Sequence, residues 1–241
     1  MRHLLLSAVP LLLLNACGSQ SSAPAPGPTA TSGSTPLSTP TAAAPAATPV
    51  AARAPRSCAD ELGAAAAAKR VEVCRNVSPA THPPCNAANS CALIEDEIAR
   101  SCALSAGDGA PMRGCGPDPR GAQAAADVVR RYYSAIDAGD YSTAWTQWGP
   151  DGRPGQSFAA FRHGFDHTTS TRVTIGALPP VEGAAGSSYL TVPVTVEATL
   201  DDGKRQRFTG NYIVRRVNDV DGATAEQRRW HLESAQLRPV G

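Results

Sequence analysis

The stretch Leu190-Thr-Val-Pro-Val-Thr-Val-Glu-Ala-Thr-Leu200 decides the fold of the C-terminal part of this chain. Its apolar residues occupy every second position, at Leu190, Val192, Val194, Val196, Ala198 and Leu200. Side chains on a β-strand point alternately to the two faces of a sheet, so this period predicts a strand with one buried face. Asp201-Asp202-Gly203-Lys204 follows and has the composition of a hairpin turn. The sequence therefore predicts an antiparallel partner strand directly downstream.

Neighbouring segments keep this two-residue period and predict an antiparallel meander. One strand is expected from Thr171, and another over Gln206 to Val217. In the last strand the apolar positions change face, from Trp230 and Leu232 to Ala235 and Leu237. A β-bulge near Glu233 would absorb that change, because a bulge inserts one extra residue into a strand.

Helices are expected before the strands. Ala122 to Ala138 is predicted as a helix, since its apolar residues recur at helical spacing. That stripe consists of Val128, Val129, Tyr132, Tyr133 and Ile136. Asp140 and Ser157 can cap two shorter helices, which the aromatic residues extend to Trp148 and Phe165. Helices followed by antiparallel strands predict the α+β class, with the helices covering the concave face of a curved sheet.

Two segments of this part resemble a known family. Val128-Val-Arg-Arg-Tyr-Tyr-Ser-Ala-Ile-Asp-Ala-Gly-Asp-Tyr-Ser-Thr-Ala-Trp145 is similar to the opening helices of the nuclear transport factor 2-like superfamily, which includes ketosteroid isomerases and SnoaL-type cyclases. Trp230-His-Leu-Glu-Ser-Ala-Gln-Leu237 is similar to its last strand. The resemblance covers about residues 122–240 and implies a cone with a pocket between helices and sheet. The pocket candidates are Tyr132, Trp145, Phe161 and Tyr212, although packing in the core is the favoured interpretation of the tyrosines and the tryptophan.

The same resemblance raises the question of catalysis. It places Tyr132 where ketosteroid isomerases carry an oxyanion-donating tyrosine, and Gln156 where their carboxylate base should be. A glutamine side chain cannot take a proton, so the isomerase mechanism fails at its central step. The remaining acid/base or metal-binding candidates are Asp151, His163, Asp166 and His167. The other interpretation of these residues is a polar helix end that runs into a loop.

Six cysteines lie in one short segment upstream of this part. They are Cys58, Cys74, Cys85, Cys91, Cys102 and Cys115. An even set of cysteines in an exported chain predicts three disulfide bonds, whose pairing the sequence leaves open. The alternative is a metal site on His82, Cys85 and Cys91, which the absence of paired CxxC motifs disfavours. We therefore predict no metal and no cofactor.

The cysteine-rich segment is predicted to be a small helical module stapled by disulfides. One helix begins at Ser57 and continues through an alanine run to Cys74. The second helix has Asn89 or Ser90 as its N-cap and continues to Cys102.

Charged residues form two local groups. The acidic run Glu95-Asp96-Glu97 is interpreted as a solvated helix face, with an acidic contact patch as the alternative. Basic residues of neighbouring strands and turns could meet an anionic envelope polymer or a partner protein, or could protect sheet edges. This basic group is Lys204, Arg205, Arg207, Arg215, Arg216, Arg228 and Arg229. The formal net charge is only +1, which argues against nucleic acid as a partner.

The N-terminus has the pattern of a lipoprotein leader. Arg2 and His3 precede an apolar run, Leu4 to Leu14, which is too short to cross a bilayer as a mature helix. Leu14-Asn-Ala-Cys17 resembles a lipobox, which implies that Cys17 becomes the acylated first residue and anchors the chain in the lipid bilayer. By the same resemblance, Gly18 rather than Asp after the cysteine favours the outer membrane over the inner membrane.

The sequence thus predicts four parts. Residues 1–16 form a signal peptide, 17–56 the lipidated cysteine with a Pro-, Ser-, Ala- and Thr-rich tether, 57–118 the six-cysteine module, and 119–241 the α+β domain. We expect an outer-membrane lipoprotein that faces the periplasm and binds or scaffolds an envelope component or a small apolar ligand without catalysis. An isomerase-, cyclase- or hydrolase-like enzyme that uses the cone pocket is the alternative.

Overall fold

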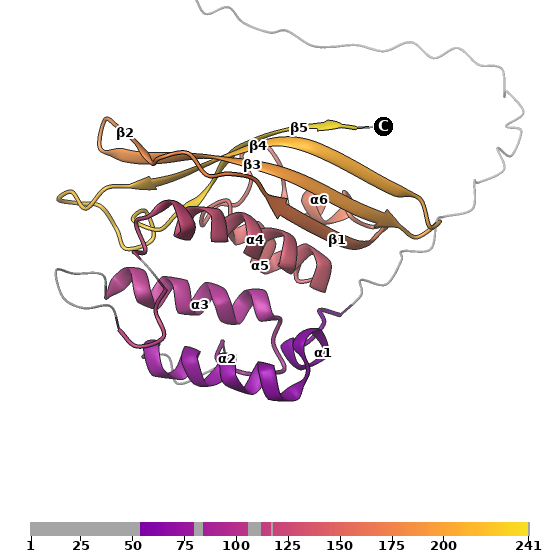
Figure 1. The fold of residues 1–241 in the computed structure, drawn as a ribbon, viewed down its shortest axis with the longest axis horizontal. Coiled ribbons are helices and arrows are strands. Elements are labelled where there is room, and N and C mark those ends of the chain that lie inside the picture. Colours follow the sequence, from indigo (N-terminus) through magenta and orange to yellow (C-terminus); the bar gives the residue numbers. More distant parts are fainter. Residues whose placement is uncertain (1–53, 80–83, 106–111, 117, 241) are drawn as a thin grey trace, which may run out of the picture. The chain divides into compact units, whose positions relative to one another are not determined.

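The computed structural model describes residues 54–79, 84–105, 112–116 and 118–240, all within one compact unit (Figure 1). Cys17, most of the predicted tether and His82 lie outside the described residues. No helix in the described ranges combines the length and apolar character that crossing a membrane requires. The elements are α1 (Cys58–Leu62), α2 (Ala64–Val77), α3 (Cys91–Leu104), α4 (Ala122–Ala138), α5 (Tyr141–Thr146), α6 (Phe158–His163), β1 (Thr168–Ile175), β2 (Glu182–Ala184), β3 (Ser187–Leu200), β4 (Arg205–Val217) and β5 (His231–Pro239).

The strands form one antiparallel sheet in the order β1-β3-β4-β5, and the short β2 pairs with β3. The alternating residues of β3 point as predicted, since Leu190, Val192, Val194 and Val196 are all buried. The predicted turn joins β3 to β4, with Leu200 N donating to Lys204 O at 2.9 Å. β1 begins at Thr168 rather than at Thr171, and the short strand β2 was not predicted.

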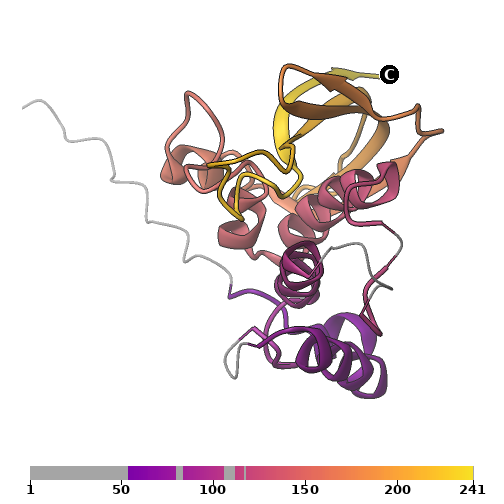
Figure 2. The ribbon, with the colours of Figure 1, turned by 90° about the vertical axis from the view of Figure 1, so that its left-hand side faces the viewer.

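The sheet curves over the helices (Figure 2), and two features of β4 and β5 produce local bends. Ile213 opposes Ser234 while Val214 opposes Leu232, so Glu233 is the extra residue of a β-bulge. The predicted bulge is therefore confirmed. At Gly210 the two strands approach so closely that a Cβ atom would lie 1.9 Å from the carbonyl oxygen of Gln236. Only glycine fits there.

The helix α4 has the predicted bounds and lies against the concave face of the sheet. Its apolar stripe is buried, and it contacts β1, β3, β4 and β5. Asp140 caps α5 by accepting from Thr143 N at 3.1 Å, and Ser157 caps α6 by accepting from Ala160 N at 3.2 Å. Both short helices end earlier than predicted, at Thr146 and His163, because turns take over before the aromatic residues beyond them.

Three disulfides connect the cysteine module, as predicted: Cys58–Cys91, Cys74–Cys85 and Cys102–Cys115. The alternative metal site is wrong, because the sulfurs of Cys85 and Cys91 are both bonded in disulfides. Each bridge stabilises the fold by about 2–4 kcal/mol, mainly by restricting the unfolded chain. The prediction of one helix from Ser57 to Cys74 is also wrong. Gly63 has φ 81° and divides it into α1 and α2.

The module and the sheet domain are joined through α3. This helix contacts α2 on one side and α4 and α5 on the other, while α4 lies between α3 and the sheet (Figures 1 and 2). Two hydrophobic clusters result, one around the disulfides and one between α4 and the sheet. Ala92 of α3 belongs to the second cluster. The described architecture is α+β, with a disulfide-linked helical module followed by helices that cover a curved antiparallel sheet.

The close approach of β4 and β5 predicts that Gly210→Ala is destabilising. The added Cβ would meet backbone rather than a flexible side chain, so we expect the free energy of unfolding to fall by about 1–3 kcal/mol. Gly183→Ala in β2 is the control, because its Cβ would have no atom within 4 Å. Urea unfolding followed by circular dichroism measures both variants. Equal stability of the two variants would contradict the packing described here.

Candidate functional site

The interior of the cone is filled by aromatic rings around Tyr132. The centroid of its ring lies 5.0 Å from that of Tyr133, and 6.0 Å from those of Trp148 and Tyr212. Phe161 completes the group at 6.3 Å. All five side chains are buried, and Tyr132 is only 3% exposed. The pocket candidates Tyr132, Phe161 and Tyr212 therefore pack on one another as core residues.

Trp145, the fourth pocket candidate, lies at the edge of this group. It is partly buried, and its ring centroid is 5.7 Å from that of Phe158 and 5.3 Å from that of Phe161. Gly152 allows this position, because a Cβ there would lie 1.7 Å from the indole ring of Trp145. The backbone of the loop after α5 thus packs directly against the indole ring of Trp145.

The tyrosine hydroxyls of the core remain protonated at neutral pH. Burial raises the pKa of Tyr132, Tyr133 and Tyr212 well above the usual value near 10. The hydroxyls of Tyr133 and Tyr212 form a hydrogen bond of 2.7 Å with each other. These groups can therefore donate hydrogen bonds, but they cannot serve as bases.

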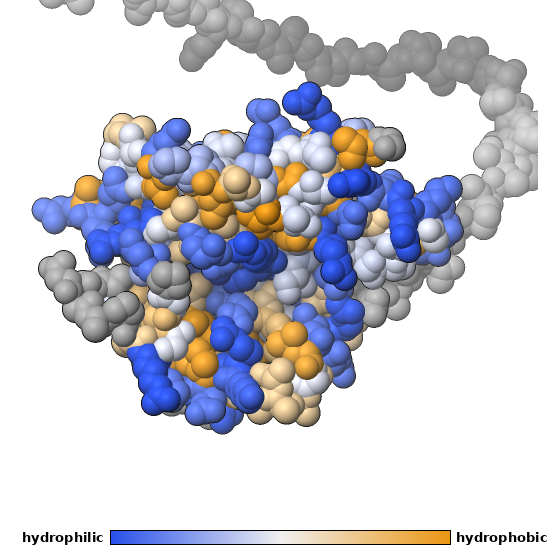
Figure 3. All heavy atoms as spheres, viewed as in Figure 1, coloured by the Kyte–Doolittle hydropathy of each residue, from blue (hydrophilic) through white to orange (hydrophobic). Residues whose placement is uncertain are grey.

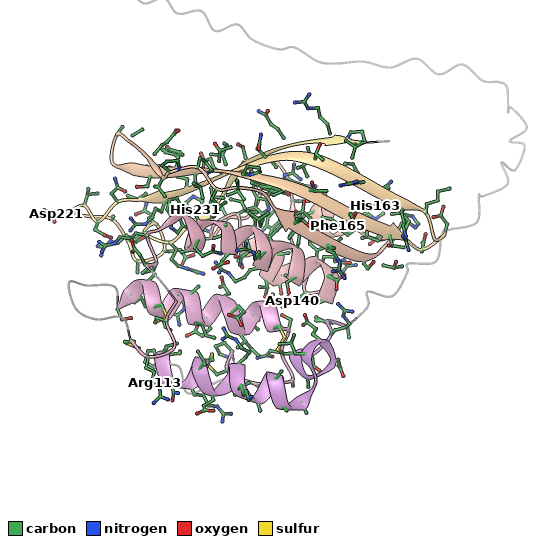
Figure 4. The ribbon with its side chains drawn as sticks, in the orientation of Figure 1. Arg113, Asp140, His163, Phe165, Asp221 and His231 are labelled. Carbon is green, nitrogen blue, oxygen red and sulfur yellow. A yellow bond between two sulfur atoms is a disulfide. The ribbon has the colours of Figure 1, made fainter. Side chains whose placement is uncertain are left out.

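The predicted acid/base residues lie at the surface in two separate pairs. His163 Nδ1 is bonded to the carboxylate of Asp166, and His167 Nδ1 lies 2.8 Å from Oδ2 of Asp201. The hydrogen bond with Asp201 raises the pKa of His167. The side chains of His163 and His167 are 83% and 79% exposed. Figure 4 shows His163 beside Phe165, well apart from His231 along the sheet.

The structure differs in two respects from the arrangement that the sequence predicted for the acid/base residues. The helix α6 ends at His163, so His163 and His167 are not one turn apart on a common helix. Tyr132 is in the core, whereas both histidines face solvent and Asp151 lies in an exposed loop. Gln156, aligned with the missing base, is partly buried, and within the described residues its Oε1 has no hydrogen-bond partner. The chain does not bring these groups to one reaction centre.

A different polar cluster lies where α3 meets α4, and it involves the acidic run of α3. The interpretation of that run as a solvated face is wrong. Glu95 is bonded to Arg70, and Glu97 is buried and bonded to Ser78 and Arg100. Glu95 and Glu97 thus hold α3 against α2 and the segment that follows it. Asp96 points in another direction, toward the sheet domain.

Asp96 is the centre of a buried ion network. Its Oδ1 accepts from Arg229 Nη2 at 2.6 Å and from Gln147 Nε2 at 3.1 Å, and Arg131 Nε lies 3.6 Å away. The side chains of Asp96, Arg229 and Arg131 are 16%, 15% and 11% exposed. Burial alone would raise the pKa of Asp96, but Arg229 and Arg131 outweigh it and lower that pKa. The carboxylate is therefore ionised and is shared by two guanidinium groups.

Hydrogen bonds between helix ends reinforce the same seam. Ser90, the N-cap of α3, donates to Oδ2 of Asp140 at 2.5 Å, and Asp140 is the N-cap of α5. Arg56 is bonded to Asp137, and its backbone N donates to Ala138 O at 2.7 Å. The first described residues of the chain are thus attached to the C-terminal end of α4.

A cavity of about 430 Å³ lies along this seam. Four guanidinium groups and two carboxylates line it, together with apolar residues from α3, α4 and the position before β5. The charged residues are Arg70, Arg130, Arg131, Arg229, Glu95 and Asp127. A cavity of this volume is in the usual range of small-molecule sites. Figure 3 shows hydrophilic and apolar residues mixed over one face of the described unit.

The predicted basic group does not form one free surface. Arg229 is committed to Asp96, and Arg216 is only 5% exposed. Arg216 donates to Arg228 O at 2.9 Å and to Asp219 Oδ1 at 3.1 Å. Two of the seven basic residues are therefore bonded within the structure and do not contribute to a surface for an anionic polymer.

Comparison with known proteins identifies no relative by sequence, since no family model and no curated protein matches the chain. Three solved structures have similar backbones over about half of it. A conserved protein from Planctomyces limnophilus DSM 3776 has 14% identity and a TM-score of 0.36 over 49% of this chain and 96% of its own. A putative scytalone dehydratase from Novosphingobium aromaticivorans DSM 12444 has 12% identity and a TM-score of 0.37 (49% and 83%), and the S. rosetta CaMKII hub has 19% and 0.34 (52% and 98%). These values transfer no activity, ligand or partner to the present chain.

Removing the charge of Asp96 should lower the free energy of unfolding more than removing the charge of its neighbour Glu95. Asp96→Asn leaves two buried guanidinium groups without their carboxylate, so we expect a loss of about 3 kcal/mol or more in unfolding free energy at pH 7. Glu95→Gln removes a half-exposed pair and should cost less than about 1 kcal/mol.

The pH dependence of the Asp96 effect follows from its lowered pKa. The carboxylate of Asp96 contributes stability above its unfolded pKa of 3.8. This contribution is lost as the pH falls through its lower pKa in the folded state. The stability gap between wild type and Asp96→Asn should therefore shrink below about pH 4. Urea titrations at pH 7, 5 and 3 measure it. A gap that is absent at pH 7 would show that the network does not stabilise the fold.

Proposed function

We propose that this chain is an outer-membrane lipoprotein, acylated at Cys17 and facing the periplasm, that binds or scaffolds an envelope component or a small ligand without catalysis. Three disulfides in one small module support an oxidising compartment, because such bonds persist outside the cytoplasm. The lipobox-like Leu14-Asn-Ala-Cys17 and the tether that follows support membrane anchoring.

We also propose that residues 119–241 belong to the nuclear transport factor 2-like superfamily. The proposal rests on the opening helices and last strand that resemble it in sequence. The order of helices before a curved antiparallel sheet agrees with it. The packed cone differs from an open ligand pocket, because aromatic rings occupy the space around Tyr132.

One observation carries the non-catalytic part of the proposal. The acid/base candidates His163, Asp166 and His167 lie on the surface, while the hydroxyl of Tyr132 is in the packed core. A general base must lie within hydrogen-bond reach of the proton it removes, so these groups cannot act on one substrate in the described arrangement. The cavity at the α3–α4 seam, which combines guanidinium groups with apolar residues, is the candidate binding site instead.

Lipid anchoring makes a direct prediction in cells. The wild-type chain should incorporate labelled palmitate and sediment with outer membranes, whereas Cys17→Ser should be unlabelled and soluble. Gly18→Asp is the matched control, because it keeps the acylated cysteine but carries the residue typical of inner-membrane retention. Fractionation with palmitate labelling measures all three. A Cys17→Ser chain that is still labelled would refute lipidation at this residue.

If the chain binds without catalysis, the surface pair His163 and Asp166 should be dispensable in cells. Crosslinking of the native chain in intact cells, read by mass spectrometry, should capture the same envelope component from wild type and from the double variant His163→Ala/Asp166→Ala. That variant should also complement a deletion strain fully. Arg162→Ala on the same helix is the control for surface changes. Partner capture with lost complementation in the double variant alone would instead support the enzymatic alternative.

A further inference from the structure

The cavity at the seam has one apolar wall and one strongly cationic side. Ile98, Ala103, Ala124 and Trp230 are among the apolar residues that line it. Arg131 lines it from α4, and its side chain is 11% exposed. A cation beside an apolar wall in a partly enclosed space favours a ligand that has both an anionic group and an apolar body.

Arg229 and Arg131 differ in how many of their hydrogen-bond donors are used. Arg229 uses one terminal nitrogen on Asp96 and the other on Glu226. Arg131 uses only Nε, which donates to Gln147 Oε1 at 3.3 Å and lies 3.6 Å from Asp96. Among the described residues, no hydrogen-bond partner occupies Nη1 or Nη2 of Arg131. Two largely buried guanidinium groups thus have two carboxylates, Asp96 and Glu226, and the terminal donors of Arg131 are left over.

The other charged residues of the lining neutralise each other. Arg70 forms a pair with Glu95, and Arg130 forms a pair with Asp127. These pairs are partly exposed and lie around the more deeply buried Arg131. Asp96 and Glu226 together match the charges of Arg131 and Arg229, so an anionic ligand would be recognised by the Arg131 donors that the described residues leave unused, rather than by an excess of positive charge.

We propose that this cavity binds a small organic monoanion, whose carboxylate pairs with the terminal nitrogens of Arg131 and whose apolar body lies against Ile98, Ala103 and Trp230. A guanidinium fork matches a carboxylate in two parallel hydrogen bonds, which gives the contact both strength and direction. The inference deepens the proposed binding function and rests on it.

The cavity occupies the part of α4 that is farther from the point where Arg56 is attached. Its α4 residues lie between Gln123 and Arg131, from the first turn to just past the middle of the helix. The chain that leads back to the predicted tether is attached at Asp137 and Ala138, at the C-terminal end. With about 1.5 Å per residue, Gln123 and Ala138 are separated by roughly 22 Å along the helix.

The test uses the full acylated chain in lipid nanodiscs, with empty nanodiscs as the reference for partition of the probe into lipid. Isothermal titration at pH 7 with hexanoate should give saturable binding of one molecule per chain. Methyl hexanoate has the same body without charge and should bind at least about 10-fold more weakly, as expected for loss of a charge-assisted hydrogen bond. Inorganic phosphate has no apolar body and should not displace hexanoate.

Three variants locate the binding site. Arg131→Gln should weaken hexanoate binding by about 10- to 100-fold, because the charged donors are lost. Ala103→Leu fills the apolar side without touching the ion network, and should weaken binding even though the seam remains intact. Arg162→Gln, on the exposed helix α6, should bind as wild type does. Thermal unfolding of each variant confirms that the chain is folded before titration.

Several results would overturn the inference. These are no saturable binding of hexanoate, equal binding of its methyl ester, displacement by phosphate at similar concentration, or wild-type affinity in both Arg131→Gln and Ala103→Leu. Such a failure leaves the proposed function standing if the envelope component is still captured by crosslinking. Failure of capture together with confirmed hexanoate binding would refute the protein-partner form of that function and retain the site.

Discussion

One largely buried carboxylate, that of Asp96, links the two halves of the described structure at the centre of their contact. Burying an ion costs several kcal/mol, and the cost is recovered only when opposite charges and hydrogen bonds surround it. Asp96 obtains them from Arg131 of α4, Gln147 after α5 and Arg229 before β5. Because these partners belong to three separate segments of the sheet domain, the cysteine module has one favourable position on it. The cavity and its cationic side exist only in that position.

The helix α3 shows what sequence reasoning reached and what it missed. Its cysteine stripe, from Cys91 to Cys102, was predictable from helical spacing, as were the Ser90 cap, the bounds of α4 and the bulge at Glu233. The contacts of a second stripe, Ala92, Asp96, Ala99 and Ala103, were not predictable, because alanines around an aspartate do not form a recurring pattern of large apolar residues. The partners of Asp96 are distant in the chain, so no local pattern marks them. Small residues around one acid on a helix were the only available signal.

The cone illustrates a different limit of sequence inference. A family resemblance placed Tyr132 at a functional position, but whether a pocket opens beside it depends on the volumes of side chains from several elements. Tyr133, Trp148, Phe161 and Tyr212 together fill that space. Burial keeps the three tyrosines neutral and their rings pack on one another, while the hydroxyls of Tyr133 and Tyr212 form a hydrogen bond with each other. The proposed ligand site therefore lies beside α4, outside the packed interior of the cone.

The location proposed for the chain and the cavity at the seam depend on the same covalent bonds. Cys102 lines the cavity and is bonded to Cys115, which fixes Gly114 and Gly116 as a further part of the wall. Gly114 has φ 102°, and a Cβ there would lie 3.0 Å from Val73 Cγ1. This backbone therefore needs glycine where it passes Val73 of α2, and the disulfide attaches it to α3. Without the bond, little apolar burial would keep so short a segment in place. A complete cavity consequently requires an oxidising compartment, which is where the N-terminal leader is expected to deliver the chain.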